Sequence, residues 1–154
     1  MAQAKCGFDD VEGGASGADL LVAYGPTLIV DIGFDPHYSS EQPVHIPLAG
    51  IRGIEALVDT GASESCIDNL LGAQLNLPIV DRRPISGIHG SQLANVYLAQ
   101  VHIPSLAFTI FGAFAGVDLA AGGQLHRALI GRTFLQRFTM VYEGATGTVT
   151  LTSV

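Results

Sequence analysis

The sequence predicts the all-β class: a mostly β domain with closed or barrel-like sheets and one or two short helices. Short apolar runs rich in β-branched residues recur along the chain, and turn residues, including 19 glycines and 7 prolines, separate them. The length of 154 residues suits a single domain. No period typical of a solenoid repeat is visible, which leaves a compact sheet structure as the prediction.

The first predicted strand is Thr27–Ile32, a β-branched run that follows a Gly25-Pro26 turn. Residues 34–43 contain two prolines and are expected to form a loop. Similar short apolar runs predict the remaining strands, which are Val44–Leu48, Ile54–Val58, Asn95–Ile103, Ala107–Phe114, Ala128–Ile130, Thr139–Tyr142 and Thr148–Thr152.

Two short helices are predicted from capping signals. Asp68 can cap a helix over Asn69–Leu75, whose apolar residues share one face and which ends before Pro78. Thr133, followed three residues later by Gln136, fits a capping box that opens a turn of helix.

The N-terminal segment, residues 1–25, differs in composition from the rest of the chain. It is rich in glycine and acidic residues, so we expect a flexible tail with Cys6 as a free thiol. The remaining residues, 26–154, then form one domain.

The charge balance excludes several classes of protein. With 7 basic and 14 acidic side chains the net charge is −7, which argues against a nucleic-acid partner. Only 14% of residues are charged, and none of them lies between Pro84 and Val117. The most apolar part of that stretch, Leu106–Val117, is shorter than the about 20 residues of a membrane-spanning helix. Because Met1–Ala18 also lacks a signal-peptide pattern, we expect no membrane partner and a cytoplasmic location. The low content of charged residues then predicts an apolar contact between subunits.

Metal and cofactor sites are not expected. Cys6 and Cys66 are too few for a disulfide scaffold and too far apart for metal-ligand spacing. His45 and His102 lie in apolar runs, and a zinc site would need a third ligand that the sequence does not place.

The most informative segment is Ala56–Ser63, in which an apolar run leads into Asp59, Thr60 and Gly61. A carboxylate at the end of a buried strand is costly unless it is hydrogen-bonded or used. Gly61 would permit a tight turn with positive φ and a close backbone approach.

Two later segments complete the pattern. Ala128–Arg132 repeats the apolar lead-in, with Gly131 where the acid stood, so this strand can pass close beside the Asp59 turn. Between the two, Ile85–Ser91 carries two glycines bracketed by apolar residues, which is typical of a mobile hairpin tip.

Together, Val58–Ser63, the glycine-bearing hairpin and Leu129–Arg132 resemble the retropepsins, the retroviral-type aspartic proteases. The resemblance covers about residues 27–152 and implies a retropepsin-like closed β-barrel, the acid-protease fold. The extra length at residues 1–26 and 118–127 is more similar to the cellular, bacterial branch of the family than to a viral protein.

The resemblance also implies a mechanism. Retropepsins carry one Asp-Thr-Gly per chain, so the site of this chain would be completed by a homodimer in which two Asp59 side chains face each other. Such a pair shares one proton, activates a water molecule and hydrolyses an extended peptide without a metal or cofactor. Asp59, Thr60 and Gly61 are the catalytic set: Thr60 would bond the opposing chain, and Gly61 would place a carbonyl near the substrate.

The remaining roles also follow from the resemblance. Ile85–Ser91 matches the hairpin that the family uses as a flap over the substrate. Residues in this flap and beside the Asp59 turn would hold the peptide as an added strand. Gly131 and Arg132 would support the site, with Arg132 either anchoring the turn or pairing at the dimer interface. The predicted substrate-binding residues are Ala62, Ser63, Ser86, Gly87, Ile88, His89 and Gly90.

One departure from the family pattern affects Arg132, and two further alternatives stay open. Many relatives have an acid at the position of Ser63 that pairs with the arginine matched by Arg132, whereas Glu64 here lies one place further on. The chain ending Thr148–Val154 could interleave with a partner, as retroviral termini do. The alternative function is a peptide-binding or dimerisation module with weak or no proteolysis.

Overall fold

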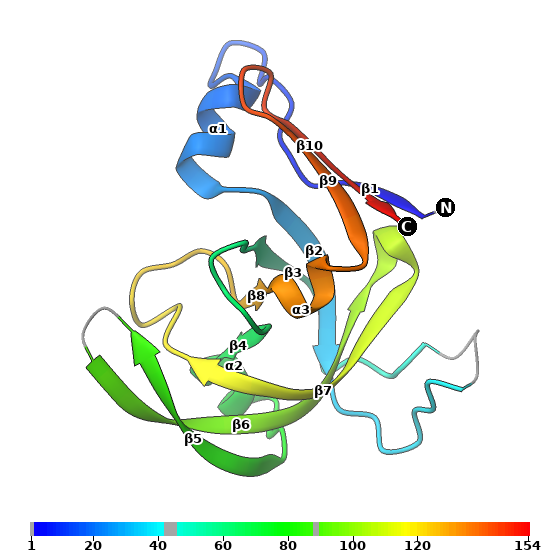
Figure 1. Ribbon diagram of the computed structural model, residues 1–154, viewed down its shortest axis with the longest axis vertical. Helices are drawn as coiled ribbons and strands as arrows, with labels where there is room; N and C mark the ends of the chain where they lie inside the picture. The colour runs from blue at the N-terminus through cyan, green and yellow to red at the C-terminus, as the bar shows by residue number, and fades with distance from the viewer. Residues whose placement is uncertain (1, 42–45, 88–89) are drawn as a thin grey trace.

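A computed structural model describes residues 2–41, 46–87 and 90–154 of the chain. Ten strands and three α-helices make up most of this part, and the strands form two sheets (Figure 1). No helix of the described residues is both long and apolar enough to span a bilayer.

The larger sheet closes on itself. Its strands follow the order β2-β3-β8-β4-β7-β6-β5, and an additional pairing between β2 and β6 closes the first six into a barrel. The mostly β fold class and the closed barrel predicted from the sequence are confirmed. The bounds are β2 Thr27–Gly33, β3 Ile51–Val58, β4 Cys66–Asp68, β5 Ile79–Gly87, β6 Gly90–Ile103, β7 Phe108–Val117 and β8 Ala128–Ile130.

The core fills the barrel with side chains that alternate along the strands. On β2, Leu28, Val30 and Ile32 are buried, whereas Ile29, which lies between Leu28 and Val30, is half exposed. The same alternation on β3 and β8 buries Val58 and Ile130, which are register partners. This period of two is what a strand with one face toward the core produces.

The predicted strand Val44–Leu48 is wrong in the part that the structure describes. Ile46 and Leu48, part of the predicted strand Val44–Leu48, lie in a loop and are 65% and 74% exposed. Pro47 between them has no N–H to donate to a sheet, which explains why the apolar run does not pair. Residues 44 and 45 lie outside the described residues.

The two predicted helices are present. Asp68 occupies the N-cap position predicted for it but makes no capping bond, and the predicted cap Thr133 is wrong. Helix α2 spans Asn69–Gln74, and Asp68 precedes it without a side-chain capping bond. The Asp68 carboxylate instead accepts hydrogen bonds from the Leu119 N–H at 3.0 Å and the Arg127 Nε at 2.9 Å. Helix α3 spans Arg132–Leu135, and Gly131 precedes it, so Thr133 lies inside the helix.

The N-terminal segment corrects the expected tail. Strand β1, Gln3–Lys5, pairs with β10, Thr148–Ser153, and residues 17–24 form helix α1. Ala4 and Cys6 are buried in the core, so the Cys6 thiol is not on a free tail. Alternation explains the docking, because Gln3 and Lys5 face outward while the small apolar side chains face inward.

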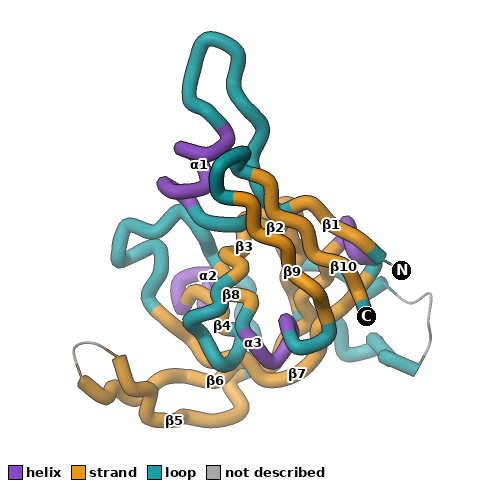
Figure 2. The backbone as a smooth tube through the Cα atoms, turned by 45° about the horizontal axis from the view of Figure 1, so that its top comes forward, coloured by secondary structure: helices purple, strands orange, loops and turns teal. Residues whose placement is uncertain are grey.

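Strands β1, β10 and β9 form the smaller sheet. Strand β9 spans Phe138–Glu143, and β10 lies between β1 and β9 with both edges paired inside the chain. Figure 2 shows both chain ends at this sheet, with β9 on the side of α3. Within one chain, both edges of the C-terminal strand are therefore occupied.

Candidate active site

Three strands position the Asp59 turn. Strand β8 lies between β3 and β4, parallel to the first and antiparallel to the second. Asp59 follows the last residue of β3, and its N–H donates to the Ile130 carbonyl of β8 at 2.9 Å. The acid is thereby tied to the centre of the barrel wall rather than to a free loop.

The turn itself closes on the Asp59 side chain. The Gly61 N–H donates to Asp59 Oδ1 at 2.8 Å, and the Ala62 N–H donates to the Asp59 carbonyl at 3.2 Å. Gly61 does not have the positive φ that the sequence suggested. Its lack of a side chain matters instead because a Cβ there would lie 3.0 Å from Asp59 Oδ1. Thr60 is exposed at the tip of the turn.

Gly131 packs directly against the chain that follows the turn. A Cβ on Gly131 would lie 2.5 Å from the carbonyl carbon of Glu64, far inside any real contact. The Gly131 N–H also donates to the Ser65 hydroxyl at 3.0 Å. Only glycine allows the two backbones to approach this closely.

Arg132 anchors the turn from the other side. Its N–H donates to the Ala62 carbonyl at 2.9 Å, and its Nη1 donates to the Thr60 carbonyl at 2.6 Å. The Thr133 N–H donates to the Ser63 carbonyl at 3.0 Å. Two roles were left open for Arg132, anchoring the turn or pairing at a dimer interface. Within one chain, the structure shows that it anchors the turn.

Glu64 has a different partner from the one considered for it. Its carboxylate lies 3.6 Å from Arg83 on β5, with both side chains partly exposed. An exposed pair of this kind contributes little stability, but it places the β5–β6 hairpin beside the Asp59 turn.

The hairpin predicted as a flap is formed by β5 and β6. Ser86 pairs with Ser91, and Gly87 pairs with Gly90, which has a φ of +103° suited to glycine. The two other predicted flap residues, Ile88 and His89, lie outside the described residues.

Three half-buried apolar side chains lie in a row beside Asp59. Leu57 on β3 is the register partner of Leu129 on β8, which in turn is the partner of Cys66 on β4. Leu57 and Asp59 are two residues apart, so the row shares the strand face of the acid. Burial, with the negative charges of Glu64 and Asp59, raises the pKa of the Cys66 thiol to about 11. The thiol is therefore protonated at neutral pH and acts as an apolar group.

Sequence reasoning missed Ser65 as a support of the site. Its side chain is buried, and its partner Gly131 is 66 residues away. No local pattern distinguishes it from a surface serine, because the contact exists only once β8 is inserted beside β4.

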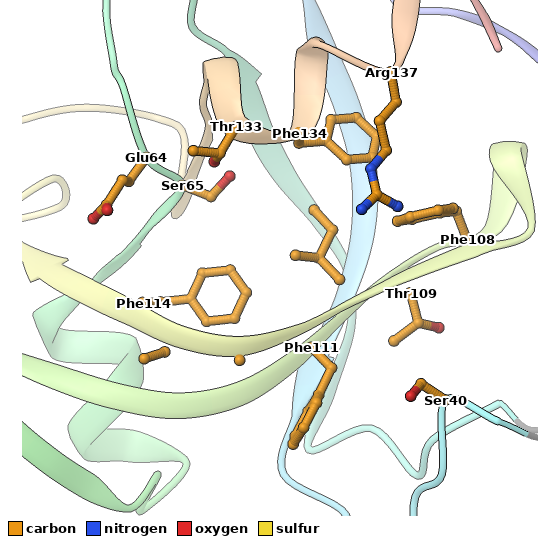
Figure 3. A pocket seen from close by; sticks show the side chains of 13 residues that line it. Ser40, Glu64, Ser65, Phe108, Thr109, Phe111, Phe114, Thr133, Phe134 and Arg137 are labelled. Carbon is orange, nitrogen blue, oxygen red and sulfur yellow. The ribbon is translucent and has the colours of Figure 1, made fainter. Parts of the chain in front are cut away.

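A cavity of about 550 Å³ begins at Glu64 and Ser65 and extends over β7 toward Arg137 (Figure 3). Phe114 points into it from β7, and Phe111, which also lines the cavity, extends to the other side of the strand. Asp59 does not line this cavity. Within the described residues, no group of three His, Cys, Asp or Glu side chains is placed to hold a metal ion.

Comparison with solved structures identifies the fold. A structure described as a retropepsin-like aspartic protease from Rickettsia conorii matches with a TM-score of 0.50 and 13% sequence identity. The match covers 97% of this chain and 89% of that one. The chain has the retropepsin-like fold. No family model and no curated protein matches the sequence. The retropepsin-like fold thus rests on the tertiary structure.

Proposed function

We propose that this chain is an aspartic endopeptidase whose active site is formed by Asp59 from each of two identical chains. The observation that carries the proposal is the Asp59 turn, closed by Gly61 and backed by Gly131 at the end of β8. A rigid, surface-reaching carboxylate held by backbone hydrogen bonds is what a positioned acid–base pair requires.

The proposed chemistry is hydrolysis by an activated water. Two carboxylates brought together across a two-fold axis cannot both ionise easily, so they share one proton and titrate in two steps. The ionised Asp59 takes a proton from the water as it attacks, and the protonated Asp59 donates to the oxygen of the scissile carbonyl. The resulting tetrahedral intermediate collapses when the amine leaves with a proton, and no covalent enzyme intermediate forms.

Substrate binding follows from the surroundings of the acid. The row of Leu57, Leu129 and Cys66 supports a preference for apolar side chains next to the cut bond. The β5–β6 hairpin would cover the peptide and bind it as an added strand through backbone groups of Ser86, Gly87 and Gly90. Ile88 and His89 at the hairpin tip, and Ala62 and Ser63 beside the acid, belong to the same proposal.

The test replaces the acid and nothing else. We expect Asp59→Asn to reduce the cleavage of a library of extended peptides by at least about 1,000-fold, because the shared proton and the base are both lost. Asp31→Asn is the matched control: Asp31 also precedes an x-Gly pair, but its carboxylate accepts from the Gly53 N–H at 2.9 Å away from the site. Equal cleavage by the Asp59→Asn chain and the wild type would refute the mechanism. A dimer that binds peptides without cutting them would support a binding module instead.

A further inference from the structure

The cavity over β7 is deepened by a glycine in the row of side chains that faces it. Every second side chain of a strand points the same way, so Phe108, Ile110, Gly112 and Phe114 form one row along β7. Gly112 adds no side chain to this row, and a Cβ built there would meet no atom within 4 Å. The resulting cavity, of about 550 Å³, has the size of a small-molecule site.

Aromatic rings form much of the wall of this cavity. Phe114 from β7 and Phe134 from α3 are 3% and 5% exposed, so they belong to the buried part of the lining. Phe108 meets Phe134 edge to face, with 5.5 Å between the ring centroids. Figure 3 shows these two rings on one side of the cavity and Phe114 on the other. Rings placed in this way can pack against the faces and edges of a further flat ring.

One charge of the lining has no opposite charge beside it. The lining contains two charged side chains, Glu64 and Arg137, and the Glu64 carboxylate is already paired with Arg83 at 3.6 Å. The Arg137 side chain makes no ion pair with any residue that the structure describes. Its guanidinium carbon lies 6.0 Å from the centroid of the Phe108 ring. Contact with a ring leaves the N–H donors of the guanidinium available to a carboxylate.

We propose that the cavity over β7 binds an aromatic monocarboxylate. The carboxylate pairs with Arg137, and the ring lies over Gly112 between Phe114 and Phe134. Asp59 does not line this cavity, so the site is a second one. The proposal therefore goes beyond the proposed function and does not rest on it.

The charges and the shape of the cavity select this class of ligand. A neutral apolar molecule would leave the guanidinium without an anion, whereas a carboxylate accepts two parallel hydrogen bonds from it. A second negative charge on the ligand would be repelled by Glu64, which lies at the end of the cavity away from Arg137. Glycine in the middle of a strand lets a ligand approach the backbone closely, which suits a flat ring over Gly112.

The binding test uses 2-naphthylacetate as the probe and isothermal titration calorimetry as the measurement. We expect a dissociation constant of about 0.1 mM or lower at neutral pH. The neutral 2-naphthylacetamide has the same ring system without the charge and should bind at least about tenfold more weakly. Equal affinity for the acid and the amide, or no saturable binding of the acid, would overturn the proposal.

Substitutions of Arg137 test the role of the guanidinium. Arg137→Gln should weaken the binding of the acid at least about tenfold and leave that of the amide unchanged. Arg137→Lys keeps the charge but not the two parallel donors, so its affinity should be intermediate. Arg82→Gln is the matched control, because Arg82 is an exposed arginine of β5 that does not line the cavity. An affinity unchanged in Arg137→Gln would refute the pairing.

A change in the aromatic wall tests the position of the ring. Phe108→Leu removes a ring that is only partly buried, and it should weaken the binding of the acid about threefold or more. Circular dichroism and thermal unfolding establish that each variant is folded. An affinity equal to that of the wild type would exclude the Phe108 end of the cavity as the site.

Two further measurements separate this cavity from the Asp59 turn. In an NMR titration of the isotope-labelled chain, the amide signals of Gly112, Phe114 and Phe134 should shift with the probe. Asp59→Asn should bind the probe with the affinity of the wild type. Shifts confined to residues 57–63, or an affinity that changes in Asp59→Asn, would place the probe at the turn and overturn the second site. Because neither measurement depends on peptide cleavage, the outcome is independent of whether the chain is a protease.

Discussion

The side chain of Arg132 donates a hydrogen bond of 2.6 Å to the backbone carbonyl of Thr60, 72 residues earlier in the chain. This bond joins the first residue of α3 to the tip of the turn that presents Asp59. A carboxylate partner for Arg132 was considered at the position of Ser63. The next residue, Glu64, is acidic but pairs with Arg83 instead. The guanidinium thus acts on the geometry of the turn rather than on the charge of a neighbouring carboxylate.

We predict that Arg132→Ala will weaken catalysis more than folding. The bond is exposed and contributes about 1 kcal/mol, so the free energy of unfolding should fall by about that amount. The released turn should lower kcat by about tenfold or more while KM changes little, since Asp59 is misplaced and the peptide groove is not. Arg132→Lys should recover part of kcat because an ammonium can still donate. A loss of stability without any change in kcat would mean that Arg132 is purely structural.

We predict that Gly131→Ala will destabilise the fold. The added Cβ would lie 2.5 Å from a backbone carbon of Glu64, and neither backbone can yield without breaking the bonds around it. Overpacking of this kind costs about 1–3 kcal/mol, which urea unfolding measures directly. Gly144→Ala is the matched control, since its nearest neighbour would be a Tyr142 ring atom at 3.4 Å. Equal unfolding midpoints for the two variants would contradict the close approach.

We predict a loss of stability in mild acid that originates at His126. Its Nε2 lies 2.8 Å from the Thr27 hydroxyl, which itself donates to the Gly25 carbonyl, so Nε2 carries the proton of the neutral ring. The other nitrogen, Nδ1, is buried without a partner in the described structure. Burial lowers the pKa of His126, and the charge of Glu55 offsets this only in part.

Proton linkage gives the direction in which the stability changes with pH. The unfolded state takes up a proton near pH 6.5, whereas the folded state does so only at lower pH. The stabilising effect is therefore complete above about pH 6.5 and is lost as the pH falls toward the folded pKa. Urea unfolding between pH 7.5 and pH 5 should show a smaller loss in His126→Gln than in the wild type. A slope unchanged in His126→Gln would exclude this origin.

Much of the barrel was predictable because its strands carry their own signals. The short apolar runs Thr27–Ile32, Ile54–Val58 and Asn95–Ile103, which are rich in β-branched residues or bounded by turns, match β2, β3 and β6. The segment Val58–Gly61 likewise carries the acid, the hydroxyl and the glycine of the turn in consecutive positions. Local patterns fail where another force decides, as at Pro47, which removes a sheet donor from an otherwise strand-like run.

The tertiary structure decided the features that depend on residues far apart in the chain. Ser65 becomes a support for Gly131 only because β8 is inserted between β3 and β4. Asp68 keeps the N-cap position of α2, but its carboxylate bonds Arg127 and the Leu119 N–H instead of the helix. Residues 3–5, with a tail-like composition around them, become a strand because β10 offers an edge and the core has room for Ala4.

By itself, the sequence determined the class of fold, the position of the acidic turn and the segments that accompany it, because each is written in consecutive residues. The folded chain decided which edges remain open, because strand pairing is a property of neighbours in space. Its pairing of β10 on both sides leaves β9 exposed.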